Sequence, residues 1–128
     1  MDKLLYIAVG GGLGAVLRYL VSGWGQRASG SATFPWGTLV VNVLGCLAIG
    51  ALGAAFAGPH RVREELRLLL LVGILGGFTT YSAFAFETFM LVDERQFARA
   101  LGNVVLTNGL CLAAAWLAYR LVQQVRGT

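Results

Sequence analysis

Four long apolar stretches dominate this chain and constrain its fold more than any other feature. They cover residues 4–24, 36–57, 68–91 and 101–122, and each has about the 20 residues that a helix needs to cross a bilayer. Only short loops and two short tails remain around them. The sequence therefore predicts an all-α membrane protein with four transmembrane helices, in a single domain of residues 1–128.

The composition excludes most soluble alternatives. Hydrophobic residues make up 57% of the chain and charged residues 12%, whereas about 25% of a soluble domain is charged. The net charge of +4 comes from basic residues that lie singly or in one loop cluster, so we predict no nucleic-acid partner. Cys46 and Cys111 fall inside apolar stretches and are interpreted as small helix-facing residues, not as a disulfide.

An even number of spans places both termini on one side of the membrane. That side carries six basic residues and the other carries three, which favours cytoplasmic termini but is a small enough difference to allow insertion in both orientations. Four helices pack without leaving a hole, so a transport function would require an oligomer, most simply a twofold dimer. The six are Lys3, Arg61, Arg63, Arg67, Arg120 and Arg126, and the three are Arg27, Arg95 and Arg99.

A glycine-rich segment of the first span fits a dinucleotide-binding fingerprint but lacks its chemistry. Gly10, Gly12 and Ala15 satisfy the pattern, yet no Asp or Glu lies between Lys3 and Arg63 to hold a ribose about 20 residues on. The sequence also has no metal-spaced cluster of His, Cys, Asp and Glu, and no nucleophile–base pair. An enzyme is therefore not predicted.

Glycine instead predicts close helix packing, because small residues four apart let helix backbones approach in lipid. The chain has 18 glycines. The candidate contact pairs are Gly10 with Gly14, Gly50 with Ala54 and Gly58, Gly73 with Gly77, and Gly109 with Ala113.

Polar side chains in the first two spans mark candidate functional positions. Arg18 lies about 14 residues into the first span, where it either snorkels to the headgroups or draws anions to a cavity mouth. Thr38 and Asn42 are one turn apart on one helix face. An asparagine in lipid needs a polar partner, so Asn42 either makes an interhelical hydrogen bond or lines a pore as a donor.

The third span contains the least helix-like stretch, Gly-Gly-Phe-Thr-Thr-Tyr-Ser at residues 76–82. A break at this depth frees carbonyl groups that must line a cavity or find partners, and such carbonyls bind cations in transporters. We predict that Gly76 and Gly77 open this helix. Downstream, Tyr81 and Phe84 share one face, where their electropositive ring edges either coordinate a small anion or pack together.

The fourth span carries a polar residue at successive turns, namely Asn103, Thr107 and Cys111. This spacing predicts a wet or hydrogen-bonding face. Glu87 is the only acid within a span. We interpret it as a structural group that caps a neighbouring helix or pairs with a basic residue, in preference to a role in proton coupling.

These motifs together resemble the Fluc family, also called the CrcB family, of fluoride ion channels. The resemblance covers essentially the whole chain and is carried by residues 14–19, 35–42 and 73–84, followed by Glu87. Its most specific part is the Gly-Gly-x-Thr-Thr-aromatic-Ser core with Trp-Gly-Thr-x-x-x-Asn upstream.

The resemblance implies an antiparallel homodimer that inserts in both orientations in a bacterial inner membrane. It implies two pathways by which cytoplasmic fluoride leaves passively. It also implies a structural sodium ion at the dimer centre, held by the carbonyls of Gly76 and Thr79 from both subunits, which suits a hard cation. The implied pathway residues are Asn42, Tyr81, Phe84, Ser82, Thr38, Asn103, Thr107 and Cys111, with Arg18 as a vestibule charge.

The chain departs from the family pattern at several positions. Tyr81 replaces the usual phenylalanine, Ala83 replaces a serine or threonine, and Asn103 and Cys111 stand where tyrosine and serine can occur. Two other functions stay open at this point. A small multidrug exporter with four spans would need an intramembrane acid, for which Glu87 is the only candidate, and a membrane assembly factor would transport nothing.

Overall fold

Four long helices make up the computed structural model, which describes residues 2–58 and 62–127. Each helix is long and apolar enough to cross a membrane, and no strand occurs within these ranges, so the predicted all-α architecture with four spanning helices is confirmed. Pro59, His60 and Arg61, from the loop after the second span, lie outside the described residues. The elements are α1 (Asp2–Ser29), α2 (Trp36–Phe56), a third span built of α3 (Glu64–Arg67), η1 (Leu68–Leu75), α4 (Gly76–Phe78) and α5 (Tyr81–Asp93), and α6 (Phe97–Arg126).

The first and last helices extend beyond the apolar spans. α1 continues to Ser29, and α6 begins at Phe97, because a helix can keep its backbone hydrogen bonds while its polar ends leave the hydrocarbon. Gly30 and Gly127 follow these helices with φ values of 65° and 70°. Glycine adopts this left-handed conformation at little steric cost, which makes it a common helix stop.

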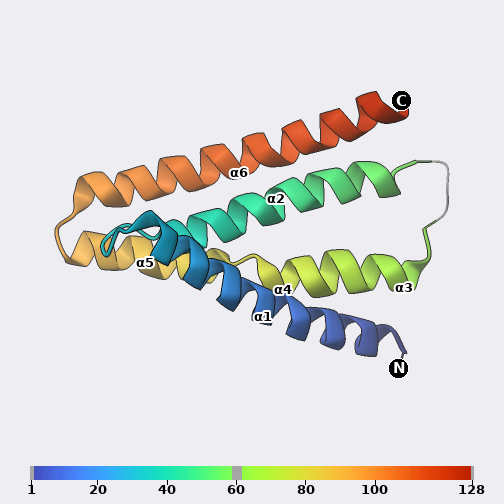
Figure 1. Cartoon of the computed structure of the whole chain (residues 1–128), viewed down its shortest axis with the longest axis horizontal. Helices are drawn as coiled ribbons and strands as arrows, with labels where there is room; N and C mark the ends of the chain where they lie inside the picture. The colour runs from blue at the N-terminus through green and yellow to red at the C-terminus, as the bar shows by residue number, and fades with distance from the viewer. Residues whose placement is uncertain (1, 59–61, 128) are drawn as a thin grey trace.

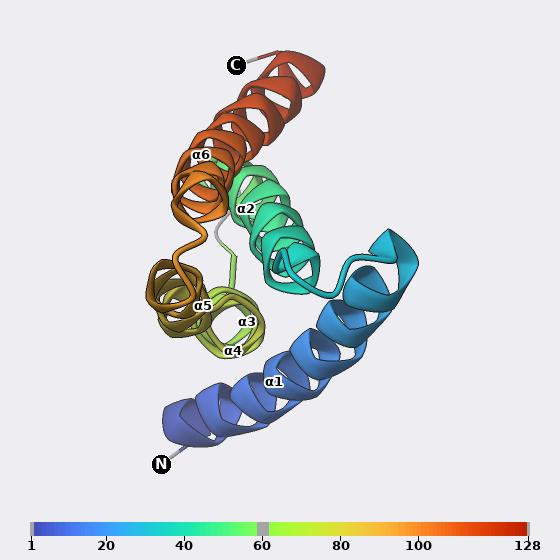
Figure 2. The same cartoon turned by 90° about the vertical axis from the view of Figure 1, so that its left-hand side faces the viewer.

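Both termini lie at the same end of the bundle, together with α3 and the C-terminal end of α2 (Figure 1). Two side-chain contacts join neighbouring helices at that end of the bundle. Lys3 Nζ lies 2.8 Å from Glu64 Oε1, and the Arg126 guanidinium donates to the carbonyls of Ala54 and Ala55 at the end of α2. α2 and α6 run side by side in the same direction, whereas α1 crosses the bundle obliquely (Figure 2).

Glycines bring α1 directly against the third span, as two of the small-residue spacings predict. A Cβ at Gly10 would meet the Cα of Gly73 at 2.9 Å, and a Cβ at Gly14 would overlap the backbone of Ile74. The backbones of the two helices are therefore in contact. The predicted close contact at Gly109 is not observed, since a Cβ there would meet nothing within 4 Å in the part of the chain that the structure describes.

The third span breaks at Thr79 and Thr80, within the predicted stretch of residues 76–82 but after the two glycines predicted to open it. Gly76 and Gly77 remain helical as part of α4, whereas Thr79 and Thr80 have extended backbones with ψ of 154° and 111°. A Cβ at Gly77 would overlap the Gly11 carbonyl of α1, so this glycine serves close packing. The β-branched threonines favour the extended conformation, and they form the break.

A π-helix precedes the break over Leu68–Leu75, which the apolar pattern did not predict. The Thr79 N–H donates to the Leu75 carbonyl over 3.0 Å, and this is the last helical hydrogen bond before the break. π-helical segments are rare and occur often at functional sites. The third span thus reaches its break through two successive departures from regular α-helix.

Candidate functional site

Asn42 holds the break in place from the neighbouring helix α2. Its Nδ2 donates to the Thr80 carbonyl over 3.0 Å, and its Oδ1 accepts from the Thr80 N–H over 2.8 Å. Both residues are buried. The interhelical hydrogen bond considered for Asn42 is therefore present, and it satisfies both backbone groups of one break residue. One amide hydrogen of Asn42 remains for a further acceptor.

Two carbonyls at the break lose their usual helical donors, one to Asn42 and the other to the Thr80 hydroxyl. The Gly76 carbonyl would accept from the Thr80 N–H in a regular helix, but that N–H donates to Asn42. The Thr79 carbonyl would accept from the Ala83 N–H, but that group donates to Thr80 Oγ1 over 3.2 Å. These two carbonyls are the predicted sodium ligands. The break thus leaves two carbonyl oxygens, the kind of ligand that a hard cation prefers, without their usual helical donors.

A cavity of about 400 Å³ opens at the break between α2, the third span and α6. We call it the break cavity. It brings together six of the predicted site residues, and none of its lining side chains carries a charge. An ion there would meet amide, hydroxyl, thiol and carbonyl groups. The predicted residues that line it are Asn42, Gly76, Thr79, Tyr81, Thr107 and Cys111.

The two predicted aromatic residues form a pair at the start of α5. The ring centroids of Tyr81 and Phe84 are 5.0 Å apart and their planes are tilted by 55°. Phe84 is buried, whereas Tyr81 is 71% exposed. Ser82 is also exposed, and its Oγ lies 3.3 Å from Thr80 Oγ1. Of these three predicted pathway residues, only Tyr81 lines the break cavity.

The polar row of α6 is a hydrogen-bonding face. Asn103 Nδ2 donates to Thr88 Oγ1 over 2.9 Å, and Thr107 Oγ1 donates to Asn103 Oδ1 over 3.2 Å. Thr88 Oγ1 in turn donates to the Phe84 carbonyl over 2.7 Å. The row is divided, because Thr107 and Cys111 reach the break cavity whereas Asn103 is used to join α6 to α5.

Thr38 and Arg18 line a second, more polar region on the other side of the break. Thr38 borders a cavity of about 640 Å³ beside the loop between α1 and α2, and a smaller cavity of about 380 Å³ that Arg18 also lines. We call the two together the loop-side cavities. Thr80 lines both the smaller one and the break cavity, so it separates the polar region from the neutral one.

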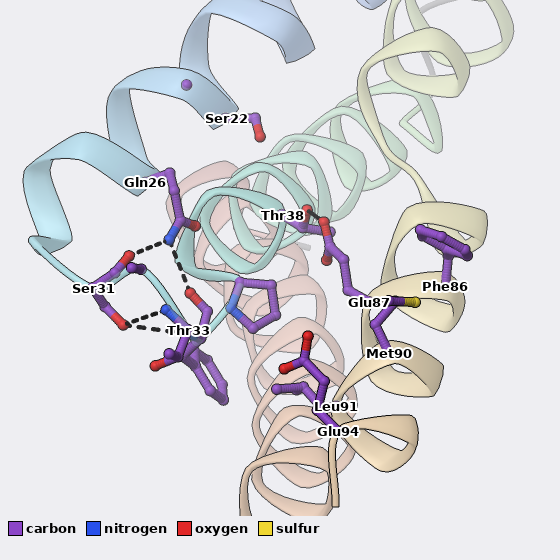
Figure 3. Close-up of a pocket in the computed structure, with 14 residues that line it drawn as sticks. Ser22, Gln26, Ser31, Thr33, Thr38, Phe86, Glu87, Met90, Leu91 and Glu94 are labelled. Carbon is purple, nitrogen blue, oxygen red and sulfur yellow. Dashed lines mark hydrogen bonds between the residues drawn. The ribbon is translucent and has the colours of Figure 1, made fainter. Parts of the chain in front are cut away.

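Glu87 joins α5 to the first turn of α2 in this region. Its Oε1 accepts from Thr38 Oγ1 over 2.6 Å (Figure 3). Within residues 2–58 and 62–127 it makes no ion pair, so the predicted pairing with a basic residue is not observed. Its Oε2 is buried and has no hydrogen-bond partner among the described residues. The preferred structural role fits a carboxyl group that links two helices through a hydroxyl.

Three residues of this network were not predicted from the sequence. Thr80 lies between the break cavity and the smaller loop-side cavity, and Thr88 links Asn103 to α5. Gln26 fastens the loop by donating to the carbonyls of Ser31 and Phe34 (Figure 3). Thr80 follows an adjacent β-branched threonine and precedes a serine, a signal that could have identified it as a helix cap. Nothing in the local sequence distinguishes the other two.

The described geometry defines a class, namely four-span membrane proteins whose third helix is interrupted beside a polar cavity. A family model described as "CrcB-like protein, Camphor Resistance (CrcB)" matches residues 5–119. The chain belongs to this family, and it is a multi-pass membrane protein.

Several relatives share nearly the whole length of the chain. One from Geobacter sulfurreducens, named fluoride-specific ion channel FluC, is 43% identical over 125 residues, which are 98% of this chain and 100% of that protein. A relative of the same name from Anaeromyxobacter dehalogenans is 43% identical over 127 residues, 99% of this chain and 100% of the other. A third, from Opitutus terrae, is 46% identical over 121 residues, 93% of this chain and 91% of the other.

Proposed function

We propose that this protein is a fluoride channel that lets cytoplasmic fluoride leave a bacterium passively across the inner membrane. The observation that carries the proposal is the Asn42 amide bound to both backbone groups of Thr80, at the wall of an uncharged cavity within the membrane span. Donors fixed in this way can replace the water around a small anion, which is how filters select ions. The relatives are named as ion channels, a class distinct from enzymes and multidrug exporters.

The conducting unit is an antiparallel homodimer with dual topology, each copy being one domain of residues 1–128. The break cavity supports this proposal, because several residues around it face outwards. Tyr81 is 71% exposed and Leu112 is 73% exposed, and both line that cavity. A second copy would cover them and complete the wall. The proposed fluoride path uses Asn42, Tyr81, Phe84, Ser82, Thr38, Asn103, Thr107 and Cys111, with Arg18 drawing anions towards its entrance.

A structural sodium ion would lie where two such copies meet at their breaks. The carbonyls of Gly76 and Thr79 fit this role, since their helical donors are used by Asn42 and Thr80. Four neutral oxygens from two copies would compensate one buried positive charge and fix the separation of the two third spans. Sodium replaced by a large organic cation should therefore lower fluoride flux and weaken dimerisation together.

Fluoride efflux from liposomes tests the function. Purified full-length protein is reconstituted with internal potassium fluoride, and release after addition of a potassium ionophore is followed with a fluoride electrode. We expect rapid fluoride release with chloride loss at least tenfold slower in matched vesicles. Equal release of both anions, or release of neither, would contradict the proposal. Asn108→Ala is a matched control for Asn42→Ala, because Asn108 lines the same cavity but bonds only its own helix at Val104.

Orientation reporters at the C-terminus test the topology. A cytoplasmic and a periplasmic reporter, each fused to single-copy protein, should both give signal if the chain inserts in both directions. Signal from one side only would exclude the dual-topology dimer while leaving fluoride conduction to be judged by the efflux assay.

A further inference from the structure

Cys46 on α2 and Cys111 on α6 lie on neighbouring helices beside the same cavity. These helices run in parallel, and their backbones touch where a Cβ on Gly50 would overlap the Ala115 carbonyl. The two cysteines stand one turn earlier on each helix, and both line the break cavity. The close approach at the glycine therefore holds both thiols at one level of the bundle.

The two thiols open into the break cavity. Both are free and partly exposed, and both line its wall together with Asn42 and Thr107. A cavity of about 400 Å³ is large enough for an ion and several waters. The two sulfur atoms are thus reachable from the region of the proposed fluoride path.

The donor set restricts what could bind there. Thiolates select soft metal ions. Zinc favours four protein ligands in structural sites, but the described residues contain no group of three or more His, Cys, Asp and Glu side chains. Two sulfurs alone suit an ion that is content with two ligands in a line. A divalent ion would give a neutral complex with two thiolates, which avoids leaving a net charge in a buried setting.

We propose that Cys46 and Cys111 form a two-thiol site for a soft, two-coordinate metal cation, for which Hg²⁺ is the best match. Two S–H bonds break and two S–Hg bonds form, and the two protons leave to water, so that no oxidant or reductant takes part. Binding is entropically favoured over two separate thiols, because both cysteines line one cavity and the second thiol is therefore present at a high effective concentration. The occupied site would also obstruct the cavity between Asn42 and Thr107, a consequence that rests on the proposed fluoride function.

Mercury retention in the presence of a competing monothiol tests the site. Full-length protein in detergent is incubated with one equivalent of HgCl₂, treated with excess glutathione, desalted and weighed by intact mass spectrometry. We expect the wild-type chain to retain one mercury, and Cys46→Ser and Cys111→Ser each to retain less than a tenth of that. Cys46→Ala and Cys111→Ala repeat the test without a hydroxyl. Equal retention by wild type and either single variant would overturn the proposal.

Mixed assemblies separate a site within one chain from a site between copies. Cys46→Ser and Cys111→Ser chains are co-expressed and purified together through different tags. We expect no recovery of mercury retention in this mixture. Recovery to half the wild-type level or more would show that the thiols of different copies meet, and would overturn the assignment to one chain.

Fluoride efflux provides a separate readout. The ratio of efflux with and without Hg²⁺ is measured for each variant, after the same glutathione treatment. We expect at least tenfold inhibition of wild type and less than twofold inhibition of the single-cysteine variants. Mercury retention in a protein that passes no fluoride would reject the channel function and leave the metal site intact. Inhibition of all variants alike would show a different point of action and reject the obstruction.

Discussion

The two halves of the third span are held by different interactions. Before the break, η1 and α4 lie with their backbone directly on α1, where glycines of both helices remove the side chains between them. After the break, α5 is linked to α2 through the Thr38–Glu87 bond and to α6 through the Asn103–Thr88 bond. A polar cavity lined by Arg18 and Glu87 separates this second half from α1.

This difference explains where polar groups can be accommodated within the span. Backbone contact between helices leaves no space for an ion or for water, and it relies on van der Waals packing. Side-chain hydrogen bonds hold helices further apart and leave cavities between them. The break at Thr79 and Thr80 lies at the change from one mode to the other, and Asn42 fixes that boundary.

Removal of the Asn42 side chain, which fixes the break from α2, should have the largest effect on stability and on fluoride efflux. Asn42→Ala leaves the N–H and carbonyl of Thr80 without partners in a buried setting, which costs about 2–4 kcal/mol for two such groups. Denaturant unfolding in detergent micelles should show this loss, and fluoride efflux should fall at least tenfold. The Asn108→Ala control should stay within about 0.5 kcal/mol of wild type. If Asn42→Ala proves as stable as Asn108→Ala, the break does not depend on Asn42.

The backbone contact between α1 and the third span before the break should be the next most sensitive to substitution, as measured by stability. Gly14→Ala places a Cβ on the Ile74 carbonyl, and overpacking of this kind costs about 1–3 kcal/mol. The matched control is Gly12→Ala on the same helix, where a Cβ meets nothing within 4 Å and the better helix propensity of alanine should stabilise slightly. Unfolding of both variants in micelles checks the pair, and equal stabilities would contradict direct backbone packing.

The hydrogen bond between Thr38 and Glu87, which links α5 to α2 after the break, should have the third largest effect on stability. Thr38→Val removes the donor to Glu87 Oε1 and leaves both carboxyl oxygens without a partner in the described residues, at a cost of about 1–2 kcal/mol. Thr38→Ser retains a hydroxyl and should recover most of this loss in the same unfolding assay. Identical behaviour of the valine and serine variants would show that the bond contributes nothing.

The smallest effect is expected at the link between α6 and α5. Asn103→Leu conserves volume but removes the bond to Thr88, and interhelical hydrogen bonds in membrane proteins contribute about 0.6 kcal/mol on average. Thr88 keeps its bond to the Phe84 carbonyl. The Thr107 hydroxyl loses Asn103 as its acceptor, but it lines the break cavity, where water can replace that acceptor. A loss of unfolding free energy above about 2 kcal/mol would show that Asn103 matters as much to the structure as Asn42. It would contradict the expectation that hydrogen bonds after the break contribute less to stability than those at the break.

The sequence by itself determined the four spanning helices, their all-α class and most residues of the polar region. Those features follow from local composition, because the bilayer requires about 20 apolar residues per helix and makes each buried polar group conspicuous. Asn42, Thr107 and Cys111 could be selected on this ground, and their spacing predicted a shared side of each helix.

Only the tertiary structure decided where the third helix opens and which polar groups meet. Gly77 is a helix breaker by local propensity, but its contact with the Gly11 backbone keeps it helical, and the opening moves to Thr79 and Thr80. The partner of Asn42 lies 38 residues away, and that of Thr38 lies 49 residues away. Neither partner follows from the pattern of a single helix, because each depends on how two helices are aligned, and that alignment is set by packing across the whole bundle.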